Sequence, residues 1–161
     1  MFSDIVNGIG GIDVNITESE AEYLRDTVKI PYIKAGKNHL NGGAALWFCR
    51  IRKLDDDFHR TERQRQVISS IVNTATKTNP FKLISTVKSV LPNIKTDIPP
   101  LKMTALIEGT GLIYMHYDIE QASVPFDGLW EDAMIDGQAV LSIDKNANIN
   151  KLHQYIYESD K

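Results

Sequence analysis

Arginine is the residue type in this chain whose spacing points most directly to chemistry. The chain has six arginines, and five of them lie between positions 50 and 65, namely Arg50, Arg52, Arg60, Arg63 and Arg65. A guanidinium group offers a planar fork of N–H donors that engages two oxygens, whereas a lysine supplies only a point charge. The cluster therefore predicts a site for phosphate or, better, for pyrophosphate.

Two elements are expected to position these arginines, and the first is the segment over residues 47–52. The side chains of Trp47, Cys49 and Ile51 alternate there with those of the intervening residues, which predicts an extended segment. Because successive side chains of a strand point to opposite faces, Arg50 and Arg52 would share one face.

The second element is a helix predicted over residues 61–76, where apolar residues recur at helical spacing. At its start Arg60, Arg63 and Gln64 stand at i, i+3 and i+4 and would share a face. The N-terminus of a helix also carries a partial positive charge, which favours an anion. If the acidic loop lets this helix fold back against the extended segment, four guanidinium groups and an amide converge. Asp57 would then lock an arginine in position or help hold a divalent cation.

Two other interpretations of the arginine cluster stay open. In the first, the arginines form a solvated surface of salt bridges with the four anions of the window, which are Asp55, Asp56, Asp57 and Glu62. In the second, they grip nucleic-acid phosphates, but six cations against four anions leave residues 50–65 a net charge of only +2. With Phe58 as the one interleaved aromatic residue, we expect no nucleic acid among the partners.

The composition is that of one ordinary globular domain. The 161 residues are 42% hydrophobic and 24% charged, with a net charge of −3, and we expect a single domain over residues 1–161. No apolar run approaches the roughly 18 residues that a membrane span requires. The single cysteine, Cys49, excludes an internal disulfide and every multi-cysteine zinc pattern, and its apolar neighbours predict a buried structural thiol.

Helices and strands are expected to alternate along the chain, which is typical of an α/β fold. Strands are predicted over residues 12–16, 30–33, 112–117 and 139–143. Helices are predicted over residues 42–48, 61–76, 80–92, 101–107 and 147–157. The glycines within residues 8–11 predict a turn ahead of the first strand.

Three segments of the chain resemble the LytR-CpsA-Psr family, the bacterial enzymes that attach anionic glycopolymers to the cell wall. Residues 10–14 resemble the GGVDV strand entry of the family, and residues 35–46 resemble its AG…LNG…AL segment. The most specific segment runs over residues 50–64 and resembles the signature RxR…D(F/Y)xRxxRQ. Together the three segments span about half of the chain, in the order that the family has.

The resemblance implies an α-β-α layered domain with a mixed central sheet and a phosphotransferase that works with Mg²⁺. It implies that a glycan phosphate of the teichoic acid or capsule type passes from a polyprenyl-pyrophosphate carrier to a hydroxyl of peptidoglycan. The residues implied as catalytic are Arg50, Arg52, Asp57 and Arg60. The residues implied to bind the pyrophosphate are Arg50, Arg52, Arg60, Arg63 and Gln64.

The polyprenyl tail of such a substrate would need an apolar pocket. One candidate lies between the helices that carry the apolar residues Ile71, Val72, Ile84 and Val87. The alternative is that these four residues are ordinary core.

The chain departs from the family pattern at its start. In the family, roughly the first half of the domain precedes the GGVDV segment and supplies a membrane anchor, central strands, metal-binding aspartates and an SRDT-type arginine. Residues 24–27 mimic that last motif at another place, so Arg25 is assigned no catalytic role. We therefore expect a partial domain without its N-terminal strands and main Mg²⁺ ligands, which self-associates or is poorly stable.

We expect the parent protein to act at the extracytoplasmic face of the bacterial membrane. The anchor that precedes the matched segments in the family would hold it there. The chain itself would be either an active enzyme or an inactive fragment that only binds. The alternative from another class is a noncatalytic module that recognises a phosphorylated polymer or partner through the same arginines.

Overall fold

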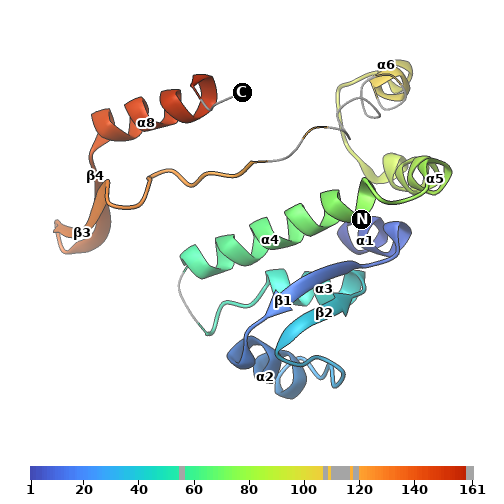
Figure 1. The fold of residues 1–161 in the computed structure, drawn as a ribbon, viewed down its shortest axis with the longest axis horizontal. Helices are drawn as coiled ribbons and strands as arrows, with labels where there is room; N and C mark the ends of the chain where they lie inside the picture. The colour runs from blue at the N-terminus through green and yellow to red at the C-terminus, as the bar shows by residue number, and fades with distance from the viewer. Residues whose placement is uncertain (55–56, 107–108, 110–116, 118–119, 159–161) are drawn as a thin grey trace. The chain divides into compact units, whose positions relative to one another are not determined.

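The computed structural model describes residues 1–54, 57–106, 109, 117 and 120–158, and for residues 57, 100 and 104 it describes the backbone. The chain divides into two compact units, residues 1–119 and residues 120–161 (Figure 1). Every arginine of the chain lies in the first unit. The organisation as one domain stays a prediction.

The first unit combines helices with one β-ribbon. Its elements in chain order are α1 (Phe2–Ile9), β1 (Ile12–Ile16), α2 (Glu18–Asp26), β2 (Gly36–Leu40), α3 (Gly42–Cys49), α4 (Asp57–Ala75), α5 (Pro80–Val90), the 3₁₀ turn η1 (Leu91–Asn93) and α6 (Pro100–Ala105). Strands β1 and β2 pair antiparallel, with Ile12 opposite Leu40 and Ile16 opposite Gly36. Helix α4 packs along β1 and against α3 (Figure 1).

The core of this unit follows from the alternation of residue types in β1. Ile12, Val14 and Ile16 are buried, whereas Asp13 and Asn15 between them are exposed. A strand places alternate side chains on opposite faces, so the ribbon has one apolar face and one polar face. The apolar face joins buried residues of α1, α2, α3 and α4 in one cluster, whose largest member is the fully buried Phe48.

Local hydrogen bonds fix where the helices next to the arginines begin. Thr17 and Glu20 form a capping box at the start of α2, in which each side chain accepts from the backbone N–H of the other residue. Asn41 caps α3 by accepting from the N–H of Ala44 at 2.9 Å. These caps satisfy N–H groups that have no partner within their own helix.

Helices α1 and α3 approach each other closely through Gly42. A Cβ atom at this position would collide with the backbone of Ser3 in α1. The N–H of Gly42 donates to the side-chain oxygen of Asn7 at 2.8 Å, and the Ser3 hydroxyl donates to the Gly42 carbonyl at 3.1 Å. The start of α3 is therefore held by α1 on two sides.

The second unit is a β-hairpin followed by a helix. Strands β3 (Trp130–Ile135) and β4 (Gln138–Ile143) pair antiparallel, and α8 (Lys145–Tyr157) follows. Asp136 and Gly137, which join the strands, both have positive φ, as a type I′ turn requires. The buried Asn148 accepts from the N–H of Phe126 and donates to the carbonyl of Leu129, so it ties the start of the helix to the preceding segment.

The predicted α/β class is confirmed, and most predicted elements are present. The strand over residues 12–16 is β1, and the strand over residues 139–143 is β4. The predicted helices correspond to α3, α4, α5, α6 and α8, with α4 beginning four residues earlier than expected. All strand pairs among the described residues are antiparallel, so these strands form two ribbons and no mixed sheet.

Two predicted strands differ in the structure, and one lies largely outside it. The strand over residues 30–33 is wrong, because Pro31 and Tyr32 form a turn that the N–H of Ile33 closes onto the Ile30 carbonyl. The extended segment is wrong over Trp47–Cys49, which belong to α3. The strand predicted over residues 112–117 lies outside the described residues except for Tyr117. None of the described helices is long and apolar enough to cross a bilayer.

Candidate anion-binding site

Arg63 of α4 is the arginine that the structure places most firmly. Only 4% of the residue is exposed, and its Nη1 atom lies 3.1 Å from the Oε1 atom of Glu20. Its Nη2 atom donates to the carbonyl oxygen of Ile51 at 2.9 Å. Arg63 thus connects α4 both to α2 and to the segment that carries Arg50 and Arg52.

The segment over residues 50–52 alternates in exposure although it is not a strand. Arg50 ends α3 as its C-terminal cap, and its N–H donates to the carbonyl of Trp47 at 3.0 Å. Ile51 is fully buried, whereas Arg50 and Arg52 on either side are exposed. The buried isoleucine anchors the segment in the core and leaves both flanking guanidinium groups on the surface.

On α4, the residues predicted to share a face divide between surface and interior. Gln64 is exposed and Arg60 is half-buried, and because they are four residues apart they lie on one side of the helix. Arg63 differs from the prediction, since its guanidinium group is buried against Glu20. Asp57 is the first residue of α4, and its side chain is outside the described part of the structure.

The Ile51–Arg63 hydrogen bond is the feature that brings the two predicted parts of the site together. It joins the backbone between Arg50 and Arg52 to the helix that carries Arg60 and Gln64. The bond thus sets the backbone of the segment that carries Arg50 and Arg52 against the first half of α4. The partial positive charge of a helix N-terminus adds to that of the guanidinium groups, so the arrangement favours an anion.

Cys49 next to this segment is not a nucleophile at neutral pH. Burial raises the pKa of its thiol to about 11, and the nearby Arg63 guanidinium only partly opposes this. The thiol therefore stays protonated, and a thiol rather than a thiolate is a weak nucleophile. The sequence predicted a buried thiol, and in the structure Cys49 is half-buried and packs against the core cluster.

The described residues do not offer a ready site for Mg²⁺. No group of three His, Cys, Asp or Glu side chains among them could hold a metal ion. Mg²⁺ prefers oxygen ligands in octahedral geometry and is commonly held by carboxylates together with substrate phosphates. The side chains of Asp55, Asp56 and Asp57, the carboxylates nearest to the arginines in the sequence, lie outside the described part.

The apolar residues considered for a polyprenyl pocket are half-buried in the structure. This holds for all four of them, Ile71, Val72, Ile84 and Val87. Ile71 packs against the core cluster, as the alternative of ordinary core would have it.

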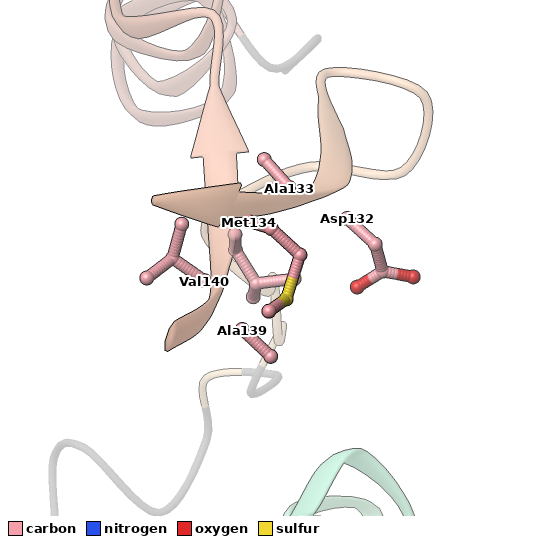
Figure 2. Close-up of a pocket in the computed structure, with 6 residues that line it drawn as sticks. Asp132, Ala133, Met134, Ala139 and Val140 are labelled. Atoms are coloured by element: carbon pink, nitrogen blue, oxygen red, sulfur yellow. The ribbon is translucent and has the colours of Figure 1, made fainter. Parts of the chain in front are cut away.

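A separate hollow lies in the second unit, on the hairpin of β3 and β4. It has a volume of about 320 Å³ and is lined by Asp132, Ala133, Met134, Ala139, Val140 and Leu141. Figure 2 shows the methionine, alanine and valine side chains grouped at the hairpin, with the Asp132 carboxylate to one side. Because its lining is apolar with one carboxylate and no cation, this hollow does not suit a phosphate group.

A polar cluster that the sequence does not predict lies on the exposed face of the β1–β2 ribbon. His39 and Asp13 are directly opposite in the ribbon, and His39 Nδ1 lies 2.8 Å from an Asp13 carboxylate oxygen. The other ring nitrogen lies 2.9 Å from the Gly10 carbonyl oxygen, and Lys37 Nζ lies 3.1 Å from Asp13. Cross-strand partners of this kind cannot be read from a sequence without the register of the strands.

The cluster stabilises charged forms of its members. The hydrogen bond to Asp13 and then that to the Gly10 carbonyl raise the pKa of His39 above 6.5. The hydrogen bonds from His39 and Lys37 lower the pKa of Asp13 below 3.8. Both ring nitrogens of His39 face acceptors, so only the imidazolium form donates to both.

This cluster predicts a pH dependence of stability. Because the pKa of His39 is raised on folding, its contribution is complete below pH 6.5 and is lost as the pH rises through the raised value. The contribution of Asp13 is present above pH 3.8 and is lost as the pH falls through its lowered pKa. We expect wild type to lose stability as the pH rises above 6.5, and we expect the His39→Gln variant not to show this decrease. The effect stays below about 1 kcal/mol because the pair is exposed.

Urea unfolding of both proteins at several pH values checks this prediction. If wild type and variant lose stability in parallel as the pH rises above 6.5, another group is responsible for the dependence.

Comparison with known proteins gives one consistent result. Residues 1–154 match the model of the LytR_cpsA_psr family. The chain is 34% identical to the polyisoprenyl-teichoic acid–peptidoglycan teichoic acid transferase TagV of Bacillus subtilis over 101 residues, 60% of this chain and 26% of that protein. It is 37% identical to the transferase TagU of Bacillus mycoides over 103 residues, which are 60% of this chain and 31% of that protein.

The fold agrees with this match. The crystal structure of B. subtilis TagV superposes on 98% of this chain with a TM-score of 0.62 and 26% identity, and the matched part is 59% of that structure. The chain therefore spans between a quarter and a third of the curated relatives, and a larger share of the solved domain.

Proposed function

Because the chain belongs to the LytR-CpsA-Psr family, we propose that its arginine site binds the pyrophosphate of a polyprenyl-linked anionic glycopolymer. The observation that supports this most is the hydrogen bond of Arg63 to the Ile51 carbonyl. It ties the exposed Arg50 and Arg52 to the helix that carries Arg60 and Gln64. The named relatives, TagU and TagV, are transferases of teichoic acid from a polyisoprenyl carrier to peptidoglycan.

In this proposal each group has a distinct role at the pyrophosphate. Arg50, Arg52 and Arg60 neutralise its oxygens through charge-assisted hydrogen bonds, and the Gln64 amide adds a neutral donor. Asp57 orients this shell. Catalysis then rests on positioning and charge neutralisation, as is general for phosphoryl transfer.

The reaction we propose is a displacement at the phosphorus next to the glycan. A sugar hydroxyl of peptidoglycan forms the new bond to that phosphorus, and polyprenyl phosphate leaves with the bridging oxygen. The hydroxyl proton passes to solvent. The arginines stabilise the negative charge that moves to the leaving phosphate.

Further parts of the proposal come from the family. Mg²⁺ would neutralise charge together with the arginines, although the described residues alone do not form its site. The place of action would be the extracytoplasmic side of the bacterial cell envelope. Attachment to the membrane and self-association of the chain stay predictions.

A noncatalytic module that binds anionic polymer is the second candidate. The exposure of Arg50 and Arg52 fits this candidate as well, because a guanidinium group binds a phosphate whether or not a reaction follows. In this case the same arginines would bind the phosphate of a polymer without transferring it.

A transfer assay separates the two candidates. The chain is incubated with a polyprenyl-pyrophosphate-linked teichoic acid and peptidoglycan, with Mg²⁺ or with EDTA. We expect transfer that Arg60→Ala lowers by roughly a hundredfold, because Arg60 would face charge that develops in the transition state. Binding of the lipid-linked polymer without any transfer would favour the noncatalytic module, and transfer unaffected by Arg60→Ala would contradict the proposed site.

A further inference from the structure

We propose that Glu20 and Arg63 form a positioning pair that holds Arg50 and Arg52 in the geometry required by the pyrophosphate, an inference that rests on the proposed function. Arg63 is only 4% exposed, and Glu20 is only 7% exposed. Neither side chain therefore reaches a ligand on the surface. Their effect on the site passes through the backbone at Ile51.

The guanidinium group of Arg63 fixes how the Ile51 carbonyl lies relative to the Glu20 carboxylate, in direction as well as in distance. Its two Nη atoms are used by different partners, Nη1 by the Glu20 carboxylate at 3.1 Å and Nη2 by the Ile51 carbonyl at 2.9 Å. Because a guanidinium group is planar and rigid, the position of the carboxylate sets the position of the carbonyl. A lysine, with one nitrogen, would lack this planar fork.

Glu20 is itself held in place at both carboxylate oxygens. Oε1 accepts a hydrogen bond from Nη1 of Arg63, and Oε2 accepts from the N–H of Thr17 at 2.8 Å within the capping box of α2. The carboxylate is therefore oriented by the start of a helix. Through Arg63 this orientation extends to Ile51.

The orientation of the Ile51 carbonyl determines the orientation of the peptide plane that leads into Arg52. A carbonyl group and the next N–H belong to one planar peptide unit, so a hydrogen bond to the Ile51 oxygen fixes the plane that leads into Arg52. The Ile51 side chain is fully buried, and its packing in the core fixes the backbone that follows Arg50. Arg50 and Arg52 therefore project from a backbone segment that two interactions with the protein interior hold in place.

The double variant Glu20→Gln/Arg63→Met tests the pair without leaving an unpaired buried charge. Glutamine keeps an oxygen for the Thr17 cap, as capping boxes allow. Arg25→Met is the matched control, since Arg25 also bridges a carboxylate, that of Glu18 at 3.3 Å, and a carbonyl, that of Ile33 at 3.1 Å. Two quantities are measured on the full chain, the affinity for farnesyl pyrophosphate and the amide hydrogen exchange at Ile51 and Arg52.

We expect the double variant to bind farnesyl pyrophosphate more weakly by on the order of tenfold, the scale on which supporting residues act on binding sites. Exchange at Ile51 and Arg52 becomes faster, and Arg25→Met changes neither quantity. In a background with Arg50→Ala and Arg52→Ala the double substitution has no further effect on affinity, because the groups that it positions are absent. A merely structural role would lower the affinity by the same factor in both backgrounds.

Each contrary result has a separate meaning. Unchanged exchange at Ile51 and Arg52, or equal losses of affinity in both backgrounds, would overturn the positioning pair while leaving the proposed function intact. If the unsubstituted chain does not bind farnesyl pyrophosphate, the proposed function fails, and with it the role of the pair toward pyrophosphate.

Discussion

Replacing Arg63 with alanine is expected to destabilise the chain by about 3–5 kcal/mol, which is the usual cost of removing one partner of a buried ion pair. The Glu20 side chain is only 9% exposed, so its carboxylate would be left in the interior without its cationic partner. The Ile51 carbonyl would lose its donor at the same time. Urea unfolding followed by circular dichroism at pH 7 measures the change.

Arg25→Ala is the control for this prediction. The ion pair of Arg25 with Glu18 is partly solvated, with side-chain exposures of 30% and 64%, so we expect its loss to cost less than about 1 kcal/mol. The Glu20→Gln/Arg63→Met variant should recover much of the stability that Arg63→Ala loses, because neither charge is left unpaired. A cost of Arg63→Ala as small as that of Arg25→Ala would contradict the buried pair.

The elements that the sequence predicted well are those whose signals are local. The period of two in β1 and the helical spacing of apolar residues in α4 each gave an element of the expected type. The helices predicted over residues 42–48 and 80–92 begin in the structure directly after the capping side chains of Asn41 and Asn79. For such segments, propensity and side-chain pattern act in the same direction.

Strand β2 shows why other elements could not be predicted. Its sequence, GKNHL, has a lysine, an asparagine and a histidine in succession and lacks the residues typical of strands. It is a strand because it pairs with β1 and because the buried Asn38 hydrogen-bonds the backbone of Lys34 and Gly36. Such tertiary contacts override the local propensity of the segment.

For the arginine cluster the structure bears on the geometry, and the roles of its residues stay a prediction. Arg50 and Arg52 are exposed, as a ligand would require. The alternation of Arg50, Ile51 and Arg52 was interpreted as a strand, although it comes from a helix end followed by a buried anchor.

The burial of Arg63 depends on Glu20, its partner 43 residues earlier in the chain. No spacing rule within the arginine cluster indicates such a partner. The local pattern therefore placed Arg63 with Arg60 and Gln64, whereas a distant carboxylate draws its side chain into the core.

In the proposed function Arg50 and Arg52 together neutralise a pyrophosphate, so we expect the Arg50→Ala/Arg52→Ala variant to have the largest effect on binding. Each hydrogen bond to a charged group contributes about 1.5–3 kcal/mol, so the loss of two such groups lowers the affinity by a hundredfold or more. Both side chains are exposed, and their truncation leaves the buried Ile51 and the core in place. Circular dichroism of the variant should therefore match that of the unsubstituted chain.

The loss should be specific to these two arginines. Lys37→Ala, together with Arg25→Ala, removes two other cations of the first unit that pair with Asp13 and Glu18, and we expect it to change the affinity little. Comparison of this double variant with Arg50→Ala/Arg52→Ala separates binding at the arginine site from a general effect of net charge.

Calorimetric titration of the chain and of the Arg50→Ala/Arg52→Ala variant with farnesyl pyrophosphate, with and without Mg²⁺, is the most direct test. We expect the unsubstituted chain to bind at one site and the variant to bind at least about a hundredfold more weakly. Equal affinities for the two proteins would contradict it.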